Sequence, residues 1–199
     1  MKNNLLSDKL AYNGDTKTRT HLHLCSYTVD RVEEAAGDDF GEMKSRFQPD
    51  GITWLQIHGL EDTDAVQTVC THFGIDFLVM QDILNTDHAS KVEEHDQYNV
   101  IIAKQIMGGE AMQVSLVQGA DFVLTFQERD NDFFDDVMRA IRNNVLKIRT
   151  RQSDYLFSVL LNGLITGYMS VAAAISDGLE ELESALLADT GDRDIGVQM

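Results

Sequence analysis

Residues 97–127 read QYNVIIAKQIMGGEAMQVSLVQGADFVLTFQ and decide the fold class. They contain three runs rich in β-branched and aromatic residues, at 97–107, 111–118 and 121–127. The runs are separated by Gly108-Gly109 and by Gly119-Ala120. Because glycine-containing dipeptides between apolar runs favour tight reversals, this stretch predicts three consecutive antiparallel strands.

The sequence before this stretch alternates between strand and helix patterns. Strands are predicted at 21–27 and 52–58, and helices at about 38–47, 63–73 and 77–84. This order predicts an α/β (α+β) fold, a mixed sheet sandwiched by helices and followed by a long acidic C-terminal helix. The expected organisation is a flexible N-terminus at 1–19, the α/β domain at 20–150, a long amphipathic helix at 151–189 and a polar tail at 190–199.

The long helix is predicted from about Asp154 to Ala188, a length of about 50 Å. Its apolar residues recur in steps of three and four, which makes a seam suited to packing against another helix. The stretch between Asp154 and Asp177 lacks charge and is long enough to cross a bilayer. Against that alternative, a polar stripe runs opposite the seam at Ser158, Asn162, Thr166 and Ser170. We therefore expect a soluble amphipathic helix.

Charge and composition restrict the function. The chain has 33 acidic against 16 basic residues and a net charge of −17, which disfavours binding to nucleic acid or to anionic lipid surfaces. Divalent cations are the expected partners. Cys25 and Cys70 lack CxxC spacing, and the polar N-terminus lacks the apolar core of a signal peptide, so we expect a cytoplasmic protein. The familiar catalytic motifs are missing from the sequence, so an enzyme is not expected.

Two local patterns are candidate metal ligands. His21 and His23 share one face of a predicted strand and are able to hold a metal together, although an exposed strand face is the simpler interpretation. The acidic run 128–136 does not have the spacing of an EF-hand loop, because Phe134 and Asp135 stand where a ligand and a glycine are needed. This run is better interpreted as the acidic start of a helix.

Six ordered segments resemble the CorA family of magnesium and cobalt channels. They are ITWLQIHGL (52–60), FGIDFLVMQDILN (73–85), KVEEHDQYNVIIAKQI (91–106), VSLVQGADFVLTFQE (114–128), NDFFDDVMRAIRNN (131–144) and RQSDYLFSVLLNGLITGYM (151–169). The resemblance covers about residues 52–188. It implies the cytoplasmic regulatory domain of a homopentameric channel, located at the cytoplasmic face of the inner membrane. The membrane would be reached only through a C-terminal part that we expect to be missing from a truncated chain.

The same resemblance implies regulatory Mg²⁺ or Co²⁺ ions held by acids between neighbouring subunits. The family's positions fall on Gln81, Asp82 and Asp135. Asp82 and Asp135 keep the carboxylate, whereas Gln81 does not, and the family's acid on the missing stalk is not in the chain. The usual His-Pro of the family is Asp76-Phe77 here, which indicates a divergent member.

Electrostatics supplies a mechanism for such a site. Two carboxylates that face each other at about 4 Å repel by about 4 kcal/mol at an effective dielectric constant of about 20. A divalent ion would cancel this repulsion and hold the subunits in one arrangement. Two alternatives remain open at this point: a Zn²⁺-transporting relative with the same architecture, and a free-standing acidic scaffold that pairs through its long helix.

Overall fold

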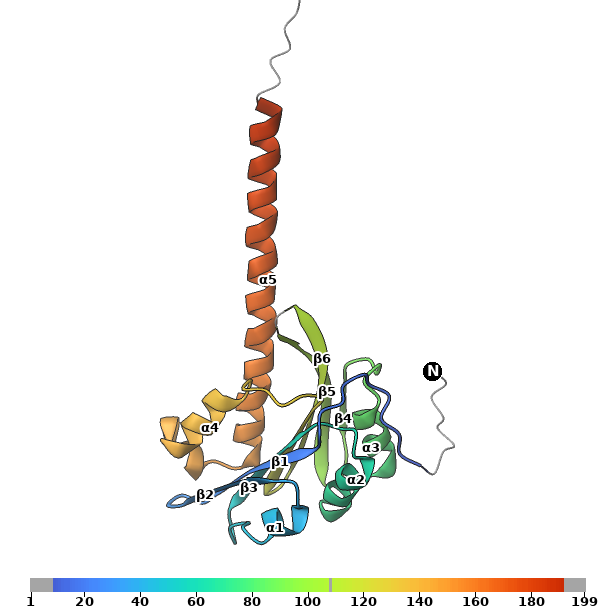
Figure 1. Cartoon of the computed structure of the whole chain (residues 1–199). Coiled ribbons are helices and arrows are strands. Elements are labelled where there is room, and N and C mark those ends of the chain that lie inside the picture. The colour runs from blue at the N-terminus through green and yellow to red at the C-terminus, as the bar shows by residue number, and fades with distance from the viewer. Residues whose placement is uncertain (1–8, 108, 192–199) are drawn as a thin grey trace, which may run out of the picture.

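The stretch 97–127 forms the antiparallel strands expected from its sequence. A computed structural model describes residues 9–107 and 109–191 and contains a seven-stranded sheet in the order β2-β1-β3-β7-β6-β5-β4 (Figure 1). The strands are β1 (His21–Tyr27), β2 (Val32–Gly37), β3 (Ile52–His58), β4 (Lys91–Glu94), β5 (Tyr98–Met107), β6 (Glu110–Gly119) and β7 (Phe122–Gln127). Neighbouring strands are antiparallel except for β3 and β7, which are parallel.

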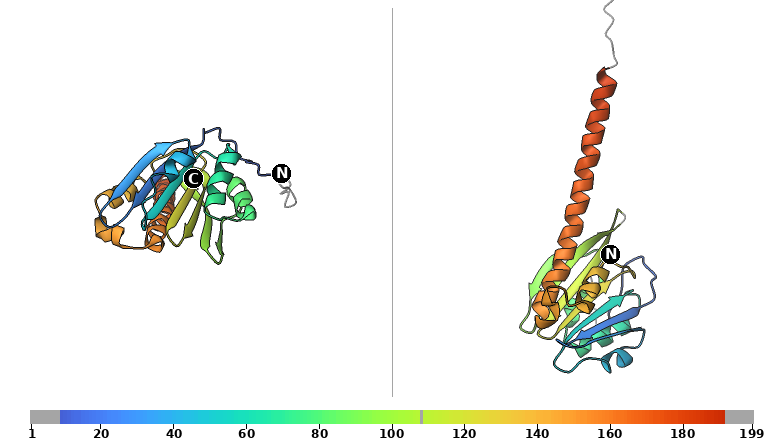
Figure 2. Two further views of the ribbon diagram at one scale, coloured as in Figure 1. Left: turned by 90° about the horizontal axis from the view of Figure 1, so that it is seen from below. Right: turned by 90° about the vertical axis from the view of Figure 1, so that its left-hand side faces the viewer.

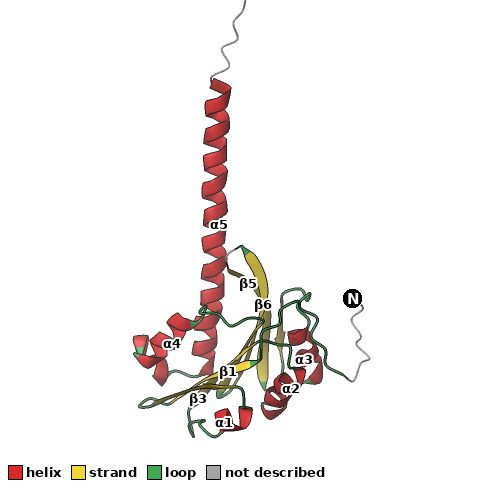
Figure 3. Cartoon of the chain, in the orientation of Figure 1, coloured by secondary structure: helices red, strands yellow, loops and turns green. Residues whose placement is uncertain are grey.

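Helices cover both faces of the sheet, as predicted (Figures 1 and 3). One core contains residues of α1 (Phe40–Lys44), α2 (Thr63–His72) and α3 (Phe77–Leu84). The other contains residues of α4 (Asp135–Arg142), the 3₁₀ helix η1 (Val145–Thr150) and α5 (Ser153–Gly191). Alternate residues of β3 enter different cores: Leu55 and Ile57 enter the first, and Trp54 enters the second. The strand is therefore buried on both faces, which explains why large apolar residues point to both of them, Trp54 to one and Leu55 and Ile57 to the other.

Three elements were not predicted, and one is shorter than expected. β2 (VEEAAG) and β4 (KVEE) are rich in glutamate and alanine, which favour strands weakly, and both lie at the edges of the sheet. The 3₁₀ helix η1 contains two residues with left-handed backbone angles, Leu146 and Lys147, so it has no regular periodicity. The helix expected at 38–47 is reduced to α1, which begins at Phe40 and ends at Lys44.

The described part of the N-terminal segment is held against the domain. Residues 10–20 form no helix or strand, but the Tyr12 hydroxyl donates to Glu128 Oε2 at 3.1 Å. The backbone N–H of Asn13 donates to the Leu84 carbonyl at 3.3 Å, and the side-chain Oδ1 of Asn13 accepts from the backbone N–H of Thr86 at 2.7 Å. The flexibility predicted for residues 1–19 remains a prediction. Residues 1–8 and most of the expected polar tail, 192–199, lie outside the described residues.

The long helix α5 packs on the sheet only with its first turns. Leu156, Leu160 and Leu164 are buried against the sheet, and the Tyr168 hydroxyl donates to the Lys104 carbonyl of β5. The helix then projects beyond the domain (Figure 2). Within the described residues, α5 is the one helix long and apolar enough to cross a membrane by length and composition alone. Its first turns belong to the protein core.

Candidate metal-binding groove

Helix α3 presents two predicted site residues at the surface. Its apolar residues Val79, Met80, Ile83 and Leu84 are buried in the first core. This leaves Gln81 and Asp82 half-buried at the rim of the helix. The helix begins after Asp76, whose carboxylate accepts a hydrogen bond from the Tyr98 hydroxyl at 2.8 Å. The burial pattern of α3 therefore fixes the direction in which Asp82 points.

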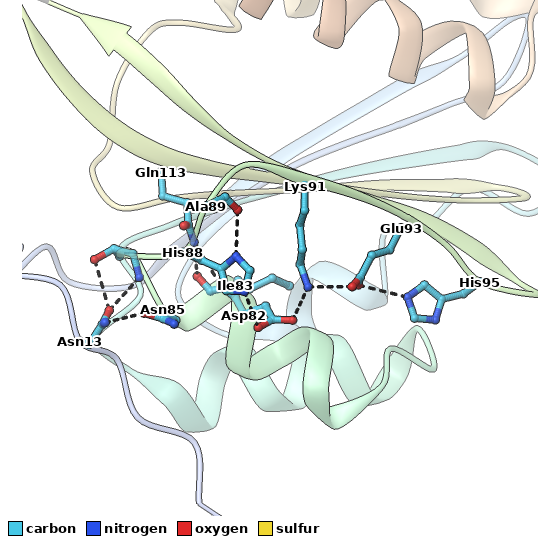
Figure 4. Close-up of polar contacts among 11 residues, drawn as sticks. Asn13, Asp82, Ile83, Asn85, His88, Ala89, Lys91, Glu93, His95 and Gln113 are labelled. Atoms are coloured by element: carbon cyan, nitrogen blue, oxygen red, sulfur yellow. Dashed lines mark hydrogen bonds and ion pairs between the residues drawn. The ribbon is translucent and has the colours of Figure 1, made fainter. Parts of the chain in front are cut away.

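Asp82 is the centre of a chain of ion pairs with residues of the 88–95 segment (Figure 4). Lys91 Nζ donates to Asp82 Oδ2 at 2.5 Å and to Glu93 Oε1 at 2.8 Å. His88 Nε2 lies 3.3 Å from Asp82 Oδ1. The side chains of Asp82 and Lys91 are only 18% and 20% exposed, so solvent screens this pair less than a fully exposed one. Asp82 therefore has an internal cationic partner.

The ion-pair chain continues to His95 and back to the start of α3. His95 Nε2 lies 3.6 Å from Glu93 Oε2, and its ring stacks on Tyr98 at 4.5 Å between centroids. The hydrogen bond from Lys91 holds the pKa of Glu93 below its usual value, against the opposing effect of burial. Burial lowers the pKa of Lys91, but its hydrogen bonds to Asp82 and Glu93 outweigh burial, and the pKa is raised overall. Lys91 and Glu93 therefore keep opposite charges at neutral pH.

A groove of about 430 Å³ lies beside these groups. It is lined by Asp76, Phe77, Leu78, Val79, Gln81, Asp82, Glu93 and His95. Its carboxylate and amide oxygens are the ligand types that hard divalent cations prefer. In a single chain, however, the Asp82 carboxylate is already paired with an ammonium group. A cation at Asp82 would have to displace Lys91, and it would need further ligands to complete its coordination shell.

Asp135 lies far from this groove in the fold. It is the first residue of α4, is exposed to solvent, and belongs to the face of the sheet opposite to α3 (Figure 1). The structure thus places Gln81 and Asp82 together and keeps Asp135 apart from them. Within the described residues, no group of three or more His, Cys, Asp or Glu side chains is arranged to hold a metal ion.

The partners of Asp82 were not predicted from the sequence. Lys91, Glu93 and His95 alternate along β4 and its continuation, so they share one face of the chain. The pairing of β4 with β5 places this face beside α3. The alternation of a lysine, a glutamate and a histidine was the one available signal. It was missed because no strand was predicted at 91–94.

Comparison with known proteins identifies the family. The sequence pattern of the family described as CorA-like Mg²⁺ transporter protein matches residues 49–198. The cobalt/magnesium transport protein CorA of Thermotoga maritima is 32% identical over an alignment of 192 residues, which covers 94% of this chain and 55% of that protein. The chain therefore spans about half the length of this curated relative.

Two solved structures share the fold. The soluble domain of CorA from Methanocaldococcus jannaschii superimposes with a TM-score of 0.60 at 19% identity, over 87% of this chain and 66% of that one. The cytoplasmic domain of ZntB from Vibrio parahaemolyticus gives a TM-score of 0.57 at 10% identity, over 80% of this chain and 64% of that one. At these identities the likeness concerns the fold alone. The match of the family pattern to three quarters of the chain decides the relationship: this chain belongs to the family of CorA-like Mg²⁺ transporter proteins.

Proposed function

We propose that the chain is the cytoplasmic, divalent-cation-sensing domain of a CorA-type magnesium and cobalt channel. In this proposal, Mg²⁺ or Co²⁺ binds between neighbouring subunits and controls ion transport. The ligands on this chain are Asp82 and Asp135, with Gln81 as a neutral oxygen ligand. The family relationship and the acidic net charge of −17 support this function.

The observation that carries the proposal is the position of Asp82 and Asp135 on opposite faces of the sheet. One chain cannot bring these carboxylates together, but two copies in a head-to-tail arrangement can. Such an interface uses different surfaces on the two partners, and repeating it around an axis closes a ring. A cyclic homo-oligomer, such as the pentamer implied by the family resemblance, is the assembly in which every such interface is occupied.

Lys91 allows Asp82 to exist in two states, one without the metal and one with it. Without the metal, the Lys91 ammonium neutralises Asp82 at 2.5 Å. When a divalent ion approaches Asp82, its charge repels the ammonium, which keeps its second partner Glu93 at 2.8 Å. The metal ion thus replaces the Lys91 ammonium at Asp82 and, unlike the ammonium, also binds a neighbouring subunit. Loss of the metal returns Asp82 to Lys91 and loosens the interface, which is a population shift between two assemblies.

Association of the chain in solution tests the intersubunit site. Light scattering of the 199-residue chain is expected to give a larger mass with Mg²⁺ than with EDTA, and Asp82→Asn is expected to remove most of this difference. Asp64→Asn changes an exposed carboxylate at the start of α2 and serves as the control. If Mg²⁺ leaves the mass of the unmodified chain unchanged, or if both variants respond alike, the Asp82 site is wrong.

Ion flux tests the role in transport. In liposomes containing a protein that carries this domain together with membrane helices, Mg²⁺ on the cytoplasmic side is expected to inhibit Mg²⁺ entry. Asp82→Asn and Asp135→Asn should each require more Mg²⁺ for the same inhibition, because each removes a charged ligand. Flux that is insensitive to cytoplasmic Mg²⁺ would exclude control by this domain.

A further inference from the structure

Three histidines from two strands form a row on the sheet face that carries α4 and α5. His21 and His23 lie on β1, and His58 on β3 is the pairing partner of His21. Residues that pair across antiparallel strands share a face, as do residues two apart on one strand. The ring centroids of His21 and His23 are 4.8 Å apart, and those of His23 and His58 are 5.0 Å apart. The histidine pair noted in the sequence therefore has a third member, His58, and the row of three does not lie on a fully exposed strand face.

Two of these rings have one nitrogen occupied by an acceptor. His21 Nδ1 lies 2.7 Å from Asp38 Oδ1. His58 Nδ1 lies 3.4 Å from both the Arg129 carbonyl and Asp130 Oδ1. A neutral ring that donates from Nδ1 has its lone pair on Nε2. Metal-bound histidines typically show this arrangement, in which the second nitrogen donates to a carboxylate or a backbone carbonyl.

The remaining nitrogen of His58 has no hydrogen-bond partner among the described residues. His58 is 1% exposed, and its Nε2 is buried without an acceptor or donor. A buried polar atom of this kind requires an explanation, and one explanation is a ligand that is missing from the structure. The surroundings favour a cation, because the carboxylates of Asp130 and Asp135 both interact with His23.

Two of the histidines, His23 and His58, have pKa values below the ordinary value. Burial lowers the pKa of His58, and the neighbouring His23 lowers it further, although Asp130 and the Arg129 carbonyl oppose these effects. Burial also lowers the pKa of His23, together with the charge of His21 and against Asp130 and Asp135. Both rings are therefore neutral at pH 7, and a metal does not have to displace a proton from either.

The separations of His23 from His21 and from His58 suit a shared ion. With metal–nitrogen bonds of about 2 Å, imidazoles around one tetrahedral ion have centroids about 5 Å apart. The observed separations of 4.8 and 5.0 Å match this value, but the rings are inclined by 83° and 49° and do not yet converge on one point. Binding would therefore require rotation of the side chains without movement of the strands.

We propose that His21, His23 and His58 form a site for a divalent transition-metal ion that prefers imidazole nitrogen, with Zn²⁺ as the probe. The site differs in chemistry and location from the groove at Asp82. Oxygen ligands suit Mg²⁺, whereas imidazole suits Zn²⁺, Cu²⁺ and Ni²⁺. The first turn of α4, which carries Asp135, lies near the row, so a bound ion would add positive charge beside that carboxylate.

Nuclear magnetic resonance of the ¹⁵N-histidine-labelled 199-residue chain at pH 7 provides the first test. One equivalent of Zn²⁺ is expected to shift the ring resonances of His21, His23 and His58, while those of His72 on α2 stay in place. A tenfold excess of Mg²⁺ should leave the row unchanged. If Zn²⁺ shifts only His88 and His95, which adjoin the Asp82 groove, or shifts no histidine, the proposal is overturned.

Calorimetric titration of matched variants provides the second test. His23→Gln should lower the Zn²⁺ affinity at least about tenfold, the size of effect already caused by losing a second-shell partner. His72→Gln should leave it unchanged, and Asp82→Asn should also leave it unchanged, which separates this site from the magnesium site. Unaltered Zn²⁺ affinity in a folded His23→Gln variant would contradict the proposal. The spectra of the unmodified chain decide the question if that variant does not fold.

Discussion

Replacing Lys91 by methionine is expected to destabilise the domain and to strengthen its response to Mg²⁺. Methionine keeps the unbranched length of the side chain but removes the ammonium that pairs with Asp82 at 2.5 Å and with Glu93 at 2.8 Å. At such separations and an effective dielectric constant of about 20, each attraction is about 6 kcal/mol before desolvation is subtracted. Most of this attraction is offset by the cost of removing the charges from water.

The net loss in the free energy of unfolding depends on how exposed the paired side chains are. Fully exposed pairs contribute about 0–1 kcal/mol, and breaking a buried pair costs about 3–5 kcal/mol. Asp82 and Lys91 are 18% and 20% exposed, and Glu93 is 37% exposed, so the pairs lie between these limits and Asp82 contributes the larger part. We expect a loss of about 1–3 kcal/mol, which lowers the melting temperature of a chain of this size by about 2–12 °C.

Thermal unfolding in EDTA and in about 10 mM Mg²⁺, at matched ionic strength, measures both effects. A ligand stabilises the folded state according to its affinity, and Mg²⁺ no longer competes with an ammonium at Asp82 in the variant. Mg²⁺ should therefore raise the melting temperature of Lys91→Met more than that of the unmodified chain. Lys44→Met, which changes an exposed lysine of α1, is the control. Equal Mg²⁺ shifts in all three proteins would refute the competition between Lys91 and the metal.

Three further predictions concern the stability of the fold. Leu160→Ala should lower the free energy of unfolding, measured with denaturant, by about 2–5 kcal/mol, because Leu160 is fully buried between α5 and the sheet. Leu179 is 61% exposed, so Leu179→Ala should lower it by less than about 0.5 kcal/mol. Stability should fall as the pH drops from about 7 to 5.5, because His58 has a lowered pKa in the folded state and therefore binds its proton more weakly there than in the unfolded chain. His58→Gln should flatten this part of the stability profile. Gly59→Ala should destabilise the protein, because Gly59 has a φ of +77° and an added Cβ would lie 2.4 Å from the Thr18 carbonyl oxygen. Gly163→Ala in α5 should instead stabilise the protein by about 0.5–1 kcal/mol, because the added Cβ meets no atom within 4 Å.

The elements with strong local signals were predicted well from the sequence. The bounds of β3 and α3 agree with the predicted 52–58 and 77–84, because an apolar run or a helical period is interrupted at both ends by residues that disfavour its continuation. The edge strands β2 and β4 lack such signals. Their strand conformation depends on hydrogen bonds to the adjacent antiparallel strands β1 and β5, and such pairing is not encoded in a local period.

The candidate sites show the same division between local and long-range information. The positions of Gln81, Asp82 and Asp135 came from the family resemblance, and their role in metal binding remains a prediction. The alternation of Lys91, Glu93 and His95 indicates that these residues share a face, but the turn at 85–90 decides which of them reaches Asp82. Likewise, His58 joins His21 and His23 only through the register of β1 and β3, and a register cannot be read from two separate strands.

The long helix shows why a continuous apolar stripe does not identify what covers it. Leu156, Leu160 and Leu164 are buried by the sheet, yet the same period continues to Ile175 and Leu179, which are 59% and 61% exposed. The sheet ends and the helix continues, so the period alone cannot distinguish the two parts. Among the described residues, eight large apolar side chains of α5 are exposed. Leaving them in water would be unfavourable, at up to about 1.5–3 kcal/mol for each large side chain. In the proposed assembly, helices of neighbouring subunits would remove this surface from water, and the metal at Asp82 would only have to select between arrangements that this apolar contact already stabilises.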